Sequence, residues 1–152
     1  PENTRLLAVV RDAMEETEQA ASALRNLAGN LDRARGGSPD TASAAREHAG
    51  AAFYQVIDER FPRWLASLDE ADPIRARDQW RRLLRSEAWT QQEALASAVP
   101  DTAFAGRGEG KGRMDVGKAL FFFRRALNVA VPAPAQQDSS AENNKNEERT
   151  PA

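Results

Sequence analysis

The stretch VGKALFFFRRALNVAV at residues 116–131 decides the fold of this chain, because it is apolar on more faces than a surface helix of a small protein. At about 100° per residue, six of its side chains form one stripe that suits a hydrophobic core. Phe121 and Phe122 point away from this stripe and flank Lys118 and Arg125. A helix that is apolar around most of its circumference is normally buried on several sides. We therefore expect a partner outside these 152 residues to cover the two phenylalanines. The residues of the stripe are Val116, Ala119, Leu120, Phe123, Ala126 and Leu127.

Three further helical segments precede this one. The first repeats apolar residues at three- and four-residue steps and stops at Gly36-Gly37, and the second begins at the cap sequence Ser38-Pro39-Asp40. The third begins after Asp72 and stops before Pro100. No segment shows the period-two alternation of a strand. The sequence therefore predicts an all-α fold, an antiparallel four-helix bundle. The core face predicted for the third helix comprises Trp80, Leu83, Leu84, Ala94, Leu95 and Ala98.

Residues 1–131 are expected to form this bundle as one domain, the C-terminal domain of a larger protein. The start on Pro1 fits either a piece of a longer protein or processing of an initiator methionine, and the over-apolar last helix favours the first. Residues 132–152 contain no apolar side chain larger than alanine. Such a segment cannot bury enough surface to offset the entropy of ordering. We expect it to be a disordered tail.

Composition excludes several classes of function. The chain has no cysteine, so it has no disulfide, thiolate nucleophile or zinc–thiolate site. Its one histidine, His48, has no second histidine one turn away and no nucleophile motif, and we expect it at the surface or at the boundary of the core. No run approaches the ~20 apolar residues of a membrane span. We expect a cytoplasmic protein that is not an enzyme, with no metal, no cofactor and no membrane partner.

Charge is spread unevenly along the chain, although the net charge is only −2. Residues 73–125 contain 11 Lys and Arg against 6 Asp and Glu. Within them Arg77, Arg81 and Arg85 recur at four-residue steps and form one ridge on the third helix. Such a ridge can follow the phosphates of a nucleic acid without reading its bases. The alternative is a solvated face that pairs with acids of the first helix, such as Glu15, Glu16 and Glu18.

A basic, glycine-rich connection joins the last two helices. It carries Arg107, Lys111 and Arg113 between four glycines. It is not a P-loop, because no strand precedes it and no Ser or Thr follows Gly110-Lys111. Either its backbone approaches a phosphate chain that these cations neutralise, or it is only a linker. The predicted nucleic-acid contacts are Arg77, Arg81, Arg85, Arg107, Lys111 and Arg113.

The tryptophans divide into two groups. Trp64 and Trp80 stand beside leucines at helical spacing, which is typical of core residues. Trp89 falls about 180° from Trp80 around the helix and is expected at the surface. Exposed apolar patches usually mark a partner. Trp89, Phe121 and Phe122 are therefore the predicted docking residues.

Three features together resemble a known family. They are AAFYQVIDERFPRWLASL at residues 51–68, the spacing to WRRLL at residues 80–84, and the final basic and aromatic helix. In these features the chain resembles the C-terminal helical bundle of CasA, the large subunit of the type I-E CRISPR surveillance complex Cascade. The resemblance covers roughly residues 5–130 and contains no catalytic motif.

The resemblance implies a non-catalytic subunit that acts in antiviral defence. In the family the bundle packs against the N-terminal domain and neighbouring subunits, helps hold unwound target DNA, and shifts when the R-loop forms, which licenses recruitment of the helicase-nuclease. Sequence is read mainly by guide RNA pairing in such complexes. The expected partners are the other Cascade subunits with their guide RNA, the target DNA backbone and the helicase-nuclease effector. The alternative is a protein-interaction bundle with no nucleic-acid role.

Overall fold

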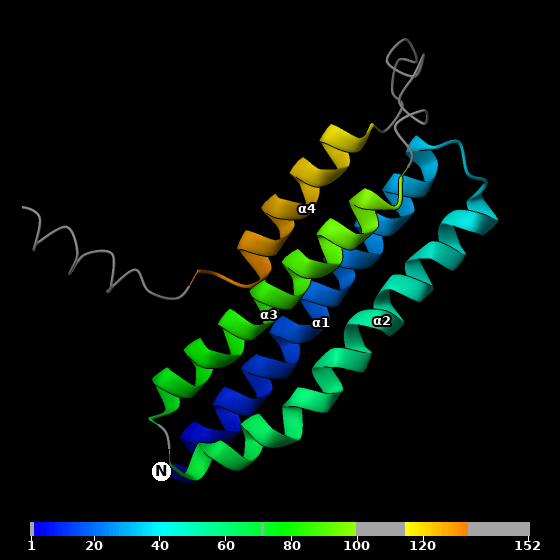
Figure 1. The fold of residues 1–152 in the computed structure, drawn as a ribbon. Helices are drawn as coiled ribbons and strands as arrows, with labels where there is room; N and C mark the ends of the chain where they lie inside the picture. The colour runs from blue at the N-terminus through cyan, green and yellow to red at the C-terminus, as the bar shows by residue number, and fades with distance from the viewer. Residues whose placement is uncertain (1, 71, 100–114, 134–152) are drawn as a thin grey trace, which may run out of the picture.

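A computed structural model of the chain describes residues 2–70, 72–99 and 115–133. These residues form four α-helices and one short 3₁₀-helix: α1 (Glu2–Ala34), α2 (Pro39–Ala66), η1 (Ser67–Asp69), α3 (Pro73–Ser97) and α4 (Val116–Ala130). Consecutive α-helices run in opposite directions (Figure 1). The predicted all-α fold and antiparallel four-helix bundle are confirmed. The predicted tail lies outside the described residues from position 134 onward.

The helix ends follow the local signals in the sequence. Gly36 adopts a φ of 90°, a left-handed conformation that glycine accepts without a steric penalty, and it ends α1. The Ser38 side chain then accepts a hydrogen bond of 3.2 Å from the backbone N–H of Thr41 and caps α2. At the other end of the chain, Asp115 accepts a bond of 2.7 Å from the N–H of Lys118 and caps α4. These caps fix where each helix starts and therefore which faces meet.

The helix α1 is the centre of the bundle. It packs against α2, α3 and α4, whereas α2 and α4 lie on opposite sides of it (Figure 1). Leu24 and Leu27 are fully buried and fill the middle of the core. Small side chains elsewhere on α1 let three neighbours approach it closely, because they remove bulk between helix axes. The buried alanines of α1 are Ala13, Ala20, Ala21, Ala23, Ala28 and Ala34.

Three aromatic rings fill the core where α2 approaches α3. Phe61, Trp64 and Trp80 lie with their ring centroids 5.0 to 5.7 Å apart. Both indole N–H groups are satisfied: Trp64 donates to the carbonyl of Ala76 at 2.9 Å, and Trp80 donates to the Thr17 hydroxyl at 2.9 Å. The predicted core positions of both tryptophans are confirmed.

Two helices bury a narrower stripe than the sequence predicts. On α3 the buried residues follow strict four-residue steps from Ala76 to Gln92, so the last turn rotates away from α1 and leaves Ala94 and Ala98 exposed. On α4 the buried residues are Ala119, Phe123 and Leu127, and Ala126 is exposed. The reason is that α4 packs mainly on α1 and touches α3 only slightly. The core positions predicted for Ala94, Ala98 and Ala126 are therefore wrong.

Candidate nucleic-acid and partner interface

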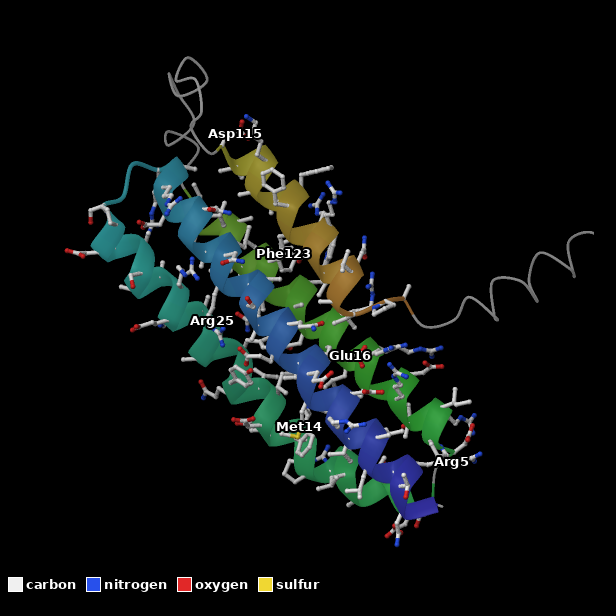
Figure 2. All side chains as sticks on the ribbon, turned by 180° about the vertical axis from the view of Figure 1, so that it is seen from behind. Arg5, Met14, Glu16, Arg25, Asp115 and Phe123 are labelled. Carbon is white, nitrogen blue, oxygen red and sulfur yellow. The ribbon has the colours of Figure 1, made fainter. Side chains whose placement is uncertain are left out.

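The predicted arginine ridge of α3 faces acidic side chains of α1. Arg81 Nε lies 2.6 Å from Glu16 Oε2, with a hydrogen bond, and Arg77 Nη2 lies 3.4 Å from Asp12 Oδ2. Glu16 is only 7% exposed, and Figure 2 shows it on the side of α1 next to α3. The predicted pairing with acids of the first helix is confirmed for Glu16. This pairing ties α3 to α1.

The pairing leaves the two arginines unequal. The Arg77 side chain remains 38% exposed, whereas that of Arg81 is 16% exposed. Arg77 Nε and Glu16 Oε1 lie 3.8 Å apart and neither has a hydrogen-bond partner, so part of this cluster is held by charge alone. A phosphate approaching either arginine must compete with Glu16. The nucleic-acid role of the ridge therefore stays a prediction, because Glu16 already occupies the arginines that a phosphate would bind.

The third residue of the ridge, Arg85, joins α3 to the end of α4. It donates to the carbonyl of Val131 at 2.6 Å and to the side-chain oxygen of Asn128 at 3.0 Å. A cation at this position also suits the negative end of the helix dipole. In the opposite direction, Arg124 of α4 donates to the buried Gln92 of α3 at 3.0 Å. Polar clamps thus fasten two helices that share little packed surface.

The phenylalanines singled out in the sequence lie on an outer face of α4 that the bundle leaves open. Phe121 is 59% exposed and Phe122 48% exposed, and their rings make an edge-to-face contact at 5.7 Å. Val129 is more exposed still. Trp89 of α3 is also exposed, and the Arg124 guanidinium lies 5.1 Å from its ring centre. The predicted exposure of all three docking residues is confirmed, and docking itself stays a prediction.

An open groove of about 560 Å³ runs between this face and α1. Phe122, Val129 and other α4 residues form its apolar wall, while Gln19, Ser22 and Asn26 of α1 supply polar groups opposite. Arg125 lies along the same groove. We call Phe121, Phe122 and Val129 the α4 aromatic face. An apolar wall with a polar and basic rim is the composition of a protein–protein contact surface.

A separate polar contact joins α1 to α2. Tyr54 donates a hydrogen bond to Glu18, which also pairs with Arg25 at 3.3 Å. Burial, and then the bond to Glu18, raises the pKa of Tyr54 to about 12. The same bond lowers the pKa of Glu18. Near the turn between the two helices, the Thr41 hydroxyl and then Arg35 lower the pKa of the Asp32 carboxyl.

The other residues and properties considered in the sequence analysis add little to the description of the site. Arg107, Lys111 and Arg113 lie outside the described residues, and His48 is exposed as expected. Within the part of the chain that the structure describes, no three His, Asp or Glu side chains gather where they could hold a metal ion. No helix in the described ranges combines the length and hydropathy needed to span a bilayer.

The sequence analysis named Glu16 among three possible acidic partners of the ridge but did not single it out. Glu16 follows Ala13 by three residues and precedes Ala20 by four, so it lies on the core stripe of α1. That spacing was a usable signal for a buried acid. Arg124 and Gln92 were missed, and nothing in their spacing indicates which helix would pack beside them.

Comparison with protein families identifies the family of this chain. Residues 2–91 match the family described as CRISPR-associated protein Cse1, which covers α1, α2, η1 and most of α3. The chain belongs to the Cse1 family. It is therefore a subunit of the Cascade type, as the resemblance implied. The match includes the ridge and Glu16, whereas the α4 aromatic face lies beyond it. Comparisons with curated proteins and with solved structures found no match.

Proposed function

We propose that this Cse1-family bundle is a non-catalytic part of Cascade that docks on a neighbouring subunit through the α4 aromatic face and helps hold unwound target DNA. The observation that carries the proposal is family membership over residues 2–91. The exposed phenylalanines support the docking half, because a large apolar side chain left in water favours association. Trp89 of α3, the third predicted docking residue, is 43% exposed and belongs to the same proposal.

The proposed contact with DNA is supported by positively charged side chains that remain accessible to solvent. Arg77 keeps more than a third of its side chain in solvent, and α4 carries Lys118 and Arg125 with no acidic residue in its span. Such cations favour backbone contact without base reading. Arg107, Lys111 and Arg113 belong to the same proposal. The proposal includes the movement of the bundle that, in the family, licenses recruitment of the helicase-nuclease.

The test of docking is native mass spectrometry. The chain is mixed with a guide-loaded Cascade assembly that lacks its large subunit, with and without a separately expressed N-terminal region of a Cse1 protein. Incorporation that depends on this region is the expected result. Failure to incorporate, while the N-terminal region itself binds the assembly, would contradict the proposal.

A second candidate function is a protein-interaction bundle with no nucleic-acid role. The observation that favours it is the internal use of Arg81 and Arg85, which bind Glu16 and the end of α4. In that case the assembly incorporates the chain but holds DNA equally well with or without it. Gel-shift measurement of target DNA affinity, with and without the incorporated chain, separates the two functions.

A further inference from the structure

A second basic site lies on the other side of α3 from the ridge. Arg60 and Arg63 of α2 line a hollow of about 230 Å³ between α2 and α3, together with Ser67 and Gln79. No carboxylate is among the described residues that line it. We infer that this hollow binds the phosphodiester backbone of single-stranded DNA, an inference that rests on the proposed function.

The first reason is that these two arginines are not used by the fold. Arg60 is exposed, as is Arg63, and within the described part of the chain neither forms an ion pair or a hydrogen bond. Glu59 precedes Arg63 by one turn, yet their charged atoms are not within ion-pair distance in the described structure. In contrast, Arg77 and Arg81 both face Glu16. A ligand at the hollow therefore meets two guanidinium groups without displacing an acid.

The second reason is the spacing of the groups. Residues three or four apart on a helix share a face with their Cβ atoms about 5–6 Å apart. Arg60, Arg63 and Ser67 follow this spacing and all line the hollow, so two cations lie in a row along one face of α2. A nucleic-acid strand presents its negative charges in a regular row. Each guanidinium can also donate two parallel hydrogen bonds to one phosphate.

The third reason is the floor of the hollow. Trp64 and Leu83 contribute apolar surface there, and the Gln79 amide supplies hydrogen-bonding groups. The Trp64 N–H is already bonded to Ala76 and the side chain is 8% exposed, so a ligand meets only the small apolar part of the ring that the core leaves uncovered. Apolar surface beside a basic rim suits the sugars and bases of a single strand, which binders of this class combine with backbone charge. An acidic peptide would satisfy the arginines but would gain less from this floor.

The test compares two double variants of the full chain. The first is Arg60→Gln with Arg63→Gln. The control is Arg11→Gln with Arg33→Gln, which removes the same charge from two exposed arginines of α1 outside the hollow. Binding of a fluorescent oligothymidine is measured by anisotropy over a range of salt concentrations. Circular dichroism and thermal melting verify that both variants are folded.

The expected result is a loss of about tenfold in affinity for the hollow variant at low salt. Its slope of log affinity against log salt should also fall by about 1.4, because each lost contact to a single strand removes about 0.7. The control should lose much less, and Arg60→Lys with Arg63→Lys should retain most of the salt slope because it keeps both charges. This pattern would support the inference.

Two other results would overturn it, and they differ in what they say about the proposed function. If the unaltered chain binds DNA and the hollow and control variants weaken it equally, the hollow is not the site, while the DNA role stands. If the unaltered chain fails to bind the oligonucleotide even at low salt, both the hollow and the DNA half of the proposed function are contradicted.

Discussion

The arginine ridge of α3 and the aromatic face of α4 were both conspicuous in the sequence, and the fold treats them in opposite ways. Arg81 is drawn into a buried pair with Glu16, and Arg85 fastens the end of α4. Phe121 and Phe122 remain in solvent. The contrast shows that a row of charges on a helix can be structural and that an apolar face can be left open. The deciding factor is which neighbouring helix lies opposite each row.

The largest effect should come from the most deeply buried aromatic residue of α3. Trp80→Ala should lower the free energy of unfolding by about 3–5 kcal/mol, because it empties a fully packed position against Phe61 and Trp64. Trp89→Ala is the matched control on the same helix and should cost no more than about 1 kcal/mol, since its ring is exposed and loses mainly the contact with Arg124. Urea denaturation measures both. Equal losses would show that the two faces of α3 are not distinct.

The next effect tests whether the ridge is part of the fold. Glu16→Gln should lower the free energy of unfolding by about 2–3 kcal/mol, because it leaves the partly buried Arg81 without its carboxylate. Glu15→Gln changes the exposed neighbour and should stay within about 0.5 kcal/mol of the unaltered chain. Denaturation at neutral pH and low salt compares them. A stability unchanged by Glu16→Gln would mean that the ridge is not held by α1.

How much of this contrast can be predicted from the sequence depends on how far apart the contacting residues lie along the chain. Caps such as Ser38 and Asp115 involve neighbours three residues away, so their residue types predict the helix boundaries. The exposure of Phe122 followed from rotation around a single helix. The sequence narrowed the partner of Arg81 only to three acids, Glu15, Glu16 and Glu18, because Glu16 lies 65 residues away and the choice among them depends on the register between α1 and α3. The hollow at Arg60 and Arg63 was missed for the same reason. The number of charges in a segment does not show which side chains will line a hollow between two helices.

A smaller effect concerns the polar contact between α1 and α2, which can be compared with the contact that the ridge makes with α1. Tyr54 is the only tyrosine of the chain, so phenolate absorbance reports it alone. The native chain should titrate with a midpoint near the raised pKa of about 12, and the denatured chain near about 10. Because the folded pKa is the higher one, the contribution of Tyr54 to stability is complete below about pH 10 and is lost as pH rises towards 12.

Two variants sharpen that titration. Glu18→Gln should bring the Tyr54 midpoint part of the way back towards the ordinary value, since burial is the larger cause and remains. Tyr54→Phe should make stability less dependent on pH in this alkaline range. A native midpoint equal to that of the denatured chain would show that the hydroxyl is neither buried nor bonded to Glu18.

The most direct test of the account is whether the α4 aromatic face carries docking. Phe121→Ser with Phe122→Ser should leave the free energy of unfolding nearly unchanged and should abolish incorporation of the chain into guide-loaded Cascade, measured by native mass spectrometry. The control is Leu7→Ser with Ile74→Ser, which removes two apolar side chains that are each 70% exposed, near the N-terminal ends of α1 and α3, and should incorporate normally. Normal incorporation of the phenylalanine variant, or equal loss in both, would contradict the account.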